Sequence, residues 1–457
     1  MKINFEKIGK KYFLSSEDGD YILLSKKEFS DFKKKESIII KKGKRLIEEK
    51  QALAFCENYN SLKKYSFSPA SLHIVVLTHK CNHACVYCRA SKFGESNKPA
   101  MDEKTAEKTA DFILSTPSKN ITVEFQGGEA FLNWDILVKS VNFLKKKNIK
   151  AKKDLEISVV TNLSLADEKK LLFLEKEGVS VCTSLDGPAE IHDKNRLYFS
   201  GSSYALTEKW LKFLNERASK KSYAKDSLPS ALMTTTRFSL NNHKEIIDCY
   251  EKLKLGGIFL RPLSPIGYAK NVWDKIGYEP RDFLKFYEKA LDYILEKNLK
   301  GIKFIERNAA IKLNKILFSQ DPNFLDLRSP CGAALGQLAY DCDGSIYTCD
   351  EGRMTASAGD DFFKVGNVFN SSYKEVLNSP AAKICSICSC LENQPSCFRC
   401  PFKQWCGVCP VHNYETSKSP WGNKGFSGWC EIEKGIFKIL IERIENKKYL
   451  RVFRGWF

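Results

Sequence analysis

The sequence contains no apolar run that approaches the roughly 20 residues needed to cross a bilayer. Its first residues, Met1-Lys-Ile-Asn-Phe-Glu-Lys7, carry charges where a signal peptide has an apolar core. Internal repeats and low-complexity linkers are also missing. We therefore expect a cytoplasmic protein with no membrane partner.

Acidic residues are scarcer than basic ones: the 457-residue chain has 55 Asp and Glu against 73 Lys and Arg, a net charge of +18. Such an excess fits a nucleic acid, a membrane surface or an acidic peptide as partner. The lysines, however, are scattered along helical stretches such as residues 143–153, which is typical of a solvated face. The charge alone therefore gives no reason to expect nucleic-acid binding.

The 17 cysteines are unevenly placed, with three at residues 81–88 and eleven between Cys331 and Cys430. In a reducing cytoplasm, so many thiols argue against disulfides. The isolated cysteines are interpreted as buried small apolar residues: Cys56, Cys182 and Cys249.

Strand and helix patterns alternate from residue 71 to about 300, which predicts a parallel sheet of βα units, open or closed into a barrel. The expected strands are 73–78, 121–125, 156–160, 179–184, 231–236 and 257–261. The expected helices include 102–115, 134–147 and 166–177. In such barrels the reactive groups lie at the carboxyl ends of the strands.

Four further segments flank this α/β region. Residues 1–70 predict a hairpin followed by a charged helix, a small α+β module. A helical pattern runs over 282–319, and its second half belongs to a helical bridge at 301–330. The bridge leads to the cysteine-rich segment 331–430. Residues 431–457 predict a C-terminal helix and tail.

Cys81, Cys85 and Cys88 follow the first expected strand directly. Three thiolates in one loop suit an iron–sulfur cluster with one iron left without a protein ligand. A structural zinc site is the alternative, but it takes four ligands, and the nearest substitutes are His79 and His83.

Gly127 and Gly128 follow the second expected strand and allow the backbone to approach a ligand closely. The next residue, Glu129, offers an acceptor for an ammonium group. In the C-terminal segment, Cys-x2-Cys pairs such as Cys397 and Cys400 are compatible with iron–sulfur clusters or with zinc knuckles.

The spacing Cys81-x3-Cys85-x-Tyr87-Cys88 resembles the signature of the radical S-adenosylmethionine (SAM) superfamily. The resemblance implies a partial (βα)6 barrel of the TIM type and a [4Fe-4S] cluster on the three cysteines. SAM would chelate the open iron, and its reductive cleavage would give a 5′-deoxyadenosyl radical that abstracts a hydrogen atom. The residue at Tyr87 would pack near the adenine.

The same resemblance assigns SAM contacts to strand ends. Gly127-Gly128-Glu129 is similar to the family's Gly-Gly-Glu-Pro motif for the SAM amino group, with Ala130 in place of proline. Polar residues at the next strand ends would contact the ribose, and an arginine would face the SAM carboxylate, for which a guanidinium fork is suited. These residues are Asn162, Ser184, Asp186 and Arg196.

The C-terminal cysteines resemble the SPASM domain, which holds two auxiliary [4Fe-4S] clusters in peptide-modifying radical SAM enzymes. The implied ligands are Cys331, Cys349 and Cys409 for the first cluster and Cys397, Cys400, Cys406 and Cys430 for the second. Two residues rather than the family's three precede Cys409 in the central group. Cys342 is the best candidate for a fourth ligand of the first cluster. An open iron is the alternative, and the remaining cysteines could also supply the ligand: Cys385, Cys388 and Cys390.

Asp350 follows Cys349 and matches the catalytic base of sulfatase-maturating relatives. The stretches 78–91, 336–354 and 390–412 resemble the radical SAM maturases of the His-Xaa-Ser peptide system. This implies an enzyme that modifies a ribosomal precursor peptide, by side-chain cross-linking, with a donor such as flavodoxin or ferredoxin. Residues 1–70 would bind a leader peptide or cap the barrel. The alternatives are a sulfatase-maturating or small-metabolite radical SAM enzyme and, from another class, a basic zinc-containing nucleic-acid-binding protein.

Overall fold

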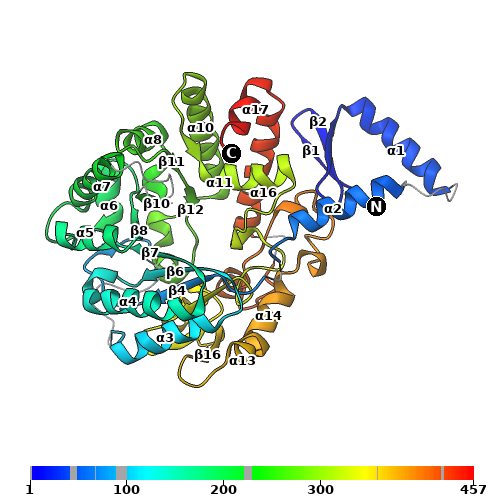
Figure 1. Cartoon of the computed structure of the whole chain (residues 1–457). Helices are drawn as coiled ribbons and strands as arrows, with labels where there is room; N and C mark the ends of the chain where they lie inside the picture. The colour runs from blue at the N-terminus through cyan, green and yellow to red at the C-terminus, as the bar shows by residue number, and fades with distance from the viewer. Residues whose placement is uncertain are drawn as a thin grey trace.

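The computed structural model describes residues 3–41, 49–66, 68–88, 100–220, 229–357, 359–423 and 427–457. Its centre is a nine-stranded sheet with the order β12-β10-β8-β7-β6-β4-β14-β15-β16 (Figure 1). Five of these strands are the expected ones: β4 (Leu72–Val76), β6 (Asn120–Gln126), β7 (Asp154–Val160), β8 (Val179–Ser184) and β10 (Ser230–Thr235). The sixth expected strand, 257–261, is divided, and only its second part, β12 (Leu260–Pro262), joins this sheet.

These six strands pair in parallel and in chain order, which confirms the predicted α/β fold. The sheet is open, because β12 ends it on one side and β4 pairs with β14 rather than closing a barrel. All six carboxyl ends therefore meet at one edge of the sheet, where parallel α/β folds hold their reactive groups.

Helices cover the outer face of this sheet (Figure 1). On β6 the alternate residues Ile121, Val123 and Phe125 are buried in the core under these helices, while Glu124 and Gln126 point to the opposite, concave face. The covering helices are α3 (Glu103–Ser115), α4 (Trp134–Ala151), α5 (Glu168–Lys176), α6 (Ala189–Asn195), α7 (Ser203–Lys220) and α8 (His243–Lys252).

The cysteine-rich segment continues the same sheet. Strand β14 (Gln337–Tyr340) pairs in parallel with β4, and the chain returns in β15 (Ser345–Tyr347) and β16 (Lys364–Asn367). A hydrogen bond of 2.8 Å between His73 Nδ1 and the Tyr340 hydroxyl crosses the β4–β14 seam. Four helices complete the segment: α12 (Asp350–Ser357), α13 (Tyr373–Asn378), α14 (Pro380–Ser389) and α15 (Pro410–Ser417).

The helical stretch expected over 282–319 is two helices, α10 (Pro280–Leu299) and α11 (Arg307–Phe318). Gly301, at φ 88°, ends the first. Between them, β13 (Ile305–Glu306) pairs with β11 (Gly257–Ile258), and the Glu306 carboxylate caps α11. The expected C-terminal helix is also two, α16 (Gly428–Ile444) and α17 (Lys447–Arg454), which lie beside α10 (Figure 1).

The N-terminal module has one strand more than the expected hairpin. An antiparallel sheet of β1 (Asn4–Ile8), β2 (Lys11–Ser15) and β3 (Tyr21–Leu24) precedes α1 (Lys26–Lys41) and α2 (Glu49–Leu62). The buried ring of Phe13 stacks on Phe402 at 5.6 Å, so the module packs on the cysteine-rich segment.

Among the helices that the structure describes, none is long and apolar enough to cross a membrane. The three isolated cysteines differ from one another. Cys249 is buried as expected, Cys182 is half-buried, and Cys56 is exposed, so the interpretation of Cys56 as a core residue is wrong. Cys56 lies on α2, a helix of low amphipathicity whose residues are largely exposed.

Candidate active site

The cysteine loop, residues 81–88, begins five residues beyond β4 at the carboxyl edge of the sheet. Within it, Cys85 belongs to the short strand β5 (Ala84–Cys85), which pairs with β9 (Arg196–Leu197) so that Cys85 lies opposite Arg196. The pKa of Cys81 is raised to about 11 and that of Cys85 to about 12, chiefly by burial and in part by the neighbouring thiols of the loop. The structure therefore brings the three cysteines together.

A network of three predicted residues lies beside Cys85. The Tyr87 hydroxyl donates to Asp186 Oδ2 at 2.6 Å, and Arg196 Nε donates to the same oxygen at 3.1 Å. The Thr234 amide donates to Asp186 Oδ1 at 3.1 Å. The Arg196 Nη1 atom then lies 3.8 Å from Cys85 Sγ. Asp186, whose two oxygens are both engaged, thus orients the arginine rather than presenting a free carboxylate.

The two glycines of the Gly-Gly-Glu motif approach protein backbone. A Cβ atom on Gly127 would lie 2.5 Å from the Thr78 carbonyl oxygen, and one on Gly128 would lie 2.2 Å from that of Lys80. The Gly128 and Glu129 amides donate to these same carbonyls at 2.7 and 2.9 Å. The glycines therefore hold the chain that enters the cysteine loop against the end of β6.

The Glu129 carboxylate is buried and already accepts three hydrogen bonds. They come from the Thr161 hydroxyl at 2.6 Å, the Asn162 amide at 2.7 Å and the Phe131 amide at 3.0 Å. Burial raises the pKa of Glu129, and these hydrogen bonds oppose the shift. Glu129 joins the ends of β6 and β7, and its role as acceptor for an ammonium group stays a prediction.

Asn162 contacts the cysteine loop directly, since its Nδ2 donates to Asn82 Oδ1 at 2.9 Å and lies 3.0 Å from His83 Nδ1. Ser184, half-buried, ends β8 on the concave face, because its alternate neighbours on the strand are buried in the outer core. The structure thus gathers the predicted Tyr87, Asp186 and Arg196 at Cys85, with Asn162 on the other side of the loop.

Two buried histidines near the loop were not predicted as site residues. His83 Nε2 and His192 Nε2 each lie 2.9 Å from the Ser203 hydroxyl. Burial lowers the pKa of His83 to about 4 and that of His192 to about 3, so both rings are neutral at pH 7. They link the cysteine loop to α6 and α7. No local pattern marks such a contact, because its partners are more than a hundred residues apart.

Two groups of four cysteines lie in the C-terminal segment. The first cysteine group comprises Cys331, Cys349, Cys385 and Cys409, which share one buried cluster. Burial raises the pKa of Cys349 well above its usual range, and the Glu351 carboxylate and the other three thiols raise it further. The second cysteine group comprises Cys397, Cys400, Cys406 and Cys430. Burial also raises the pKa of Cys406. The Glu433 carboxylate and the other three thiols of that group contribute to the same shift.

The expected fourth ligand of the first auxiliary cluster, Cys342, does not lie with the first cysteine group. It sits at the turn of the β14–β15 hairpin, whereas Cys331 precedes β14 and Cys349 follows β15, at the opposite end. Its thiol donates to the Val76 carbonyl at 3.3 Å. Cys342, His79 and Asp341 form a buried set whose ligand atoms lie within 4.8 Å of one another.

The remaining cysteines of the segment are placed differently from Cys385. Cys388 lies beside Cys385. Burial is the main cause of the raised pKa of Cys385, and the thiols of Cys331 and, more weakly, Cys388 add to it. Cys390 donates to Glu392 Oε2 at 3.2 Å. Cys385, one of the alternatives to Cys342 as fourth ligand, therefore lies with the first cysteine group.

Asp350 begins α12 directly after Cys349 and is buried. Its Oδ1 accepts from Arg353 Nε at 2.8 Å. It lies near Glu124 on the concave face of β6, whose pKa is raised by burial and, more weakly, by Asp350. The neighbouring Glu351 pairs with Arg261 of β12 at 3.9 Å. Asp350 thus lies between the first cysteine group and the concave face, with its carboxylate paired.

Comparison with known proteins agrees with this geometry. Residues 75–220 match the radical SAM superfamily. The chain contains a radical SAM domain. This finding replaces the alternative of a zinc-containing nucleic-acid-binding protein, because the matched segment holds the cysteine loop and the SAM-side strand ends up to Arg196.

Two curated relatives extend beyond the radical SAM domain. The cysteine-type anaerobic sulfatase-maturating enzyme of Clostridium perfringens is 25% identical over 324 residues, 68% of this chain and 80% of that one. The subtilosin biosynthesis protein AlbA of Bacillus subtilis is 25% identical over 379 residues, 80% of this chain and 72% of that one. The solved structure of native anSMEcpe with bound AdoMet and Kp18Cys peptide matches the fold with a TM-score of 0.68 at 21% identity, over 85% of this chain and 99% of that one.

A radical SAM enzyme uses SAM and a [4Fe-4S] cluster, and the residues present fit both. Three thiols in one short loop leave one iron of a [4Fe-4S] cluster for a non-protein ligand. The Arg196 guanidinium, next to Cys85, offers a positive group with a geometry that suits a carboxylate.

Proposed function

We propose that this enzyme cleaves SAM and modifies a ribosomally made precursor peptide by cross-linking its side chains. The observation that carries the proposal is the arrangement of the cysteines. The cysteine loop and the first cysteine group are attached to neighbouring strands, β4 and β14, of one continuous sheet. The relatives that include AlbA, a protein of bacteriocin biosynthesis, support a peptide as substrate.

The roles of the residues at the carboxyl edge follow from their contacts. Cys81, Cys85 and Cys88 would hold the radical SAM cluster, and Arg196, oriented by Asp186, would bind the SAM carboxylate. Tyr87 would pack near the adenine. The candidate contacts of the remaining SAM groups are Gly127, Gly128, Glu129, Asn162 and Ser184.

We further propose three [4Fe-4S] clusters in total. The first cysteine group, completed by Cys385, and the second cysteine group would each hold one auxiliary cluster. When bound, the three clusters and SAM supply one-electron transfer and a 5′-deoxyadenosyl radical. Asp350 would take up the proton that a substrate loses during cross-linking, which requires the carboxylate to leave Arg353. An external protein such as flavodoxin or ferredoxin would supply electrons.

The N-terminal module would bind the leader of the peptide. Its strand β3 pairs only with β2 among the described strands, so one edge of the small sheet is available for an added strand. The half-exposed side chains of Tyr21, Leu23 and Leu24 and the exposed Ile22 line this edge. If the leader is acidic, the basic charge of the chain would speed the encounter.

Co-expression with each small peptide encoded beside the gene tests the proposal. A cross-linked peptide loses two hydrogens, which mass spectrometry resolves. The variant Cys400→Ala should retain 5′-deoxyadenosine formation but yield no cross-linked peptide. Full product from this variant would remove the second cysteine group from the mechanism.

The sulfatase-maturating activity of the Clostridium relatives is the second candidate, favoured by Asp350 beside the first cysteine group. A peptide carrying a sulfatase active-site cysteine, incubated with SAM and reductant, would distinguish it. Conversion of that cysteine to an aldehyde, with no change in any co-encoded peptide, would favour the sulfatase. A small-metabolite substrate would leave both peptides unchanged.

A further inference from the structure

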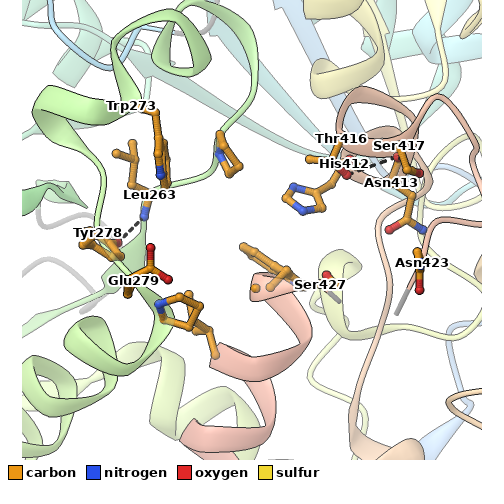
Figure 2. A pocket seen from close by; sticks show the side chains of 15 residues that line it. Leu263, Trp273, Tyr278, Glu279, His412, Asn413, Thr416, Ser417, Asn423 and Ser427 are labelled. Atoms are coloured by element: carbon orange, nitrogen blue, oxygen red, sulfur yellow. Dashed lines mark hydrogen bonds between the residues drawn. The ribbon is translucent and has the colours of Figure 1, made fainter. Parts of the chain in front are cut away.

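A cavity of about 410 Å³ lies just beyond the carboxyl end of β12 (Figure 2). One wall is the segment 263–280 that follows this strand, and the other comes from α15 and the first turn of α16. The carboxyl ends of β12 and of the SAM-side strands share one edge of the sheet. The cavity therefore adjoins the side of the enzyme on which the chemistry takes place.

The two helices of the second wall each lie next to ligand-type cysteines. Helix α15 starts directly after Cys409 of the first cysteine group, whose Sγ accepts from the His412 amide at 3.3 Å. Helix α16 contains Cys430 of the second cysteine group in its first turn, beside the cavity residue Trp429. A group bound in the cavity would lie close to both cysteine groups.

Four aromatic rings line the cavity, two on each side. Trp273 and Tyr278 on one side have ring centroids 6.3 Å apart, and His412 and Trp429 on the other are 5.7 Å apart. Figure 2 shows Trp273 and His412 on opposite sides of the opening. Indole and phenol faces attract cations, most strongly when the cation is partly desolvated.

The charge of the lining differs from that of the chain. Lys and Arg make up 73 of 457 residues, yet among the described residues that line the cavity there is neither. The one carboxylate among these described residues is that of Glu279, exposed at the rim beside Tyr278 (Figure 2). The nearby Arg237 is engaged elsewhere, donating to the Gly277 and Asp274 carbonyls at 2.8 and 2.7 Å.

Gly277 fixes the position of the Trp273 indole. A Cβ atom at Gly277 would lie 2.4 Å from Cδ2 and Cε2 of that ring. The Arg237 hydrogen bond to the Gly277 carbonyl holds this contact in place. Trp273 is thus backed by the main chain and presents its other face, which suits a preformed binding surface.

We propose that the cavity binds a lysine or arginine side chain of the substrate peptide. The aromatic rings contact the stem and face the charge, and Glu279 pairs with the ammonium or guanidinium group. Identifying the ligand as part of the precursor peptide rests on the proposed function. Binding of a cationic side chain does not, and it is measured without SAM cleavage.

The test uses reconstituted holoenzyme labelled with 5-fluorotryptophan, in which a Trp273→Phe variant assigns the Trp273 fluorine signal. The probes are N-acetyl-Gly-Lys-Gly-amide and the same peptide with norleucine, which keeps the aliphatic stem and removes the charge. We expect the lysine peptide to shift the Trp273 signal with at least about fivefold tighter binding than the norleucine peptide. The signal of Trp134, which packs against Phe131 and Phe173 on the outer helical face, should not move.

Two variants complete the test. Glu279→Gln should weaken binding of the lysine peptide about three- to tenfold and leave the norleucine peptide unaffected. Gly277→Ala should abolish the preference by displacing the indole. Equal binding of both peptides, or no shift at Trp273, overturns the proposal. Because 5′-deoxyadenosine formation is measured separately on the same preparations, these outcomes do not depend on whether the proposed peptide chemistry is correct.

Discussion

The cysteine loop and the first cysteine group hold similar thiols in opposite surroundings. The loop is half-exposed and places its three cysteines within eight residues, beside the Arg196 guanidinium. The first cysteine group draws its thiols from four separate segments. Three of them are buried, and carboxylates lie near: Glu351 acts on Cys349 and Cys409, and Asp326 acts on Cys331 and Cys409.

This difference indicates two ways of making a cluster site. In the loop, protein contacts already fix the geometry: the β5–β9 pairing, the Asp186 network and the glycines at β6. In the first cysteine group, burial and carboxylates raise the pKa of the thiols, so a bound cation would favour their charged form. The loop is preorganised by the chain, and we predict that the first cysteine group depends on a bound metal for its order.

The largest effect is expected in the loop. Cys85→Ala removes the thiol that faces Arg196 and should abolish reductive SAM cleavage, because three thiolates are the minimum for this cluster. Quantification of 5′-deoxyadenosine under reducing, anaerobic conditions measures it. Cys56→Ser, at an exposed thiol on α2, is the matched control and should retain full activity. Normal 5′-deoxyadenosine from Cys85→Ala would refute the assignment of the loop.

The next test compares Cys385 with Cys342. Cys385→Ala should lose about four of about twelve irons per chain and lower the thermal stability of the C-terminal segment, because iron orders the first cysteine group. Cys342→Ala, at the hairpin turn, should keep all its iron. Iron and sulfide analysis of the two variants, beside their melting curves, measures both effects. The reverse pattern would restore Cys342 as the ligand.

A smaller effect is expected from the network that preorganises the loop. Asp186→Asn removes the charge that orients Arg196, and Tyr87→Phe removes only one donor to the same oxygen. We expect SAM affinity to fall about 10- to 100-fold in the first and about fivefold in the second, in keeping with a loss of about 1–3 kcal/mol for a buried charged hydrogen bond. Equilibrium binding of SAM to holoenzyme measures this. Unchanged affinity in Asp186→Asn would remove Arg196 from the SAM site.

Much of the fold could be predicted because its information is local. The six strands carry apolar runs or alternation that any parallel sheet requires, and the cysteine spacing in the loop is a property of eight residues. The break between α10 and α11, where Glu306 caps the second helix, shows where local prediction fails. A helical pattern runs through residues 300–306, but strand pairing between β11 and β13 decides that the helix stops there.

Sequence spacing leaves the direction of each site residue open. Cys342 lies between Cys331 and Cys349 in sequence, yet a hairpin sends its turn to the opposite end from both. Gly127 and Gly128 stay candidate SAM contacts, and in the structure they approach the Thr78 and Lys80 carbonyls. The position of Cys342 and the contacts of the two glycines both depend on which strands pair with β4, and no short motif encodes that pairing.

The seam between β4 and β14 joins the two regions, and its stability should depend on pH. Burial lowers the pKa of His73, which contacts Tyr340 across the seam, to about 3 from an unfolded value of 6.5. Because the folded ring resists protonation, its contribution to stability is complete above pH 6.5. Below that it falls by about 1.4 kcal/mol per pH unit until pH 3.

His73→Gln keeps a polar partner for the Tyr340 hydroxyl and removes the titration. Between pH 7 and pH 5 its melting temperature should therefore fall less than that of the parent protein, although it starts lower. His243→Gln is the matched control, because His243 is only partly buried and lies away from the seam on α8. Burial also lowers the pKa of this half-buried ring, so its removal should flatten the curve, but by less than His73→Gln does. Parallel curves for His73→Gln and the parent protein would show that the seam does not limit the stability of the molecule.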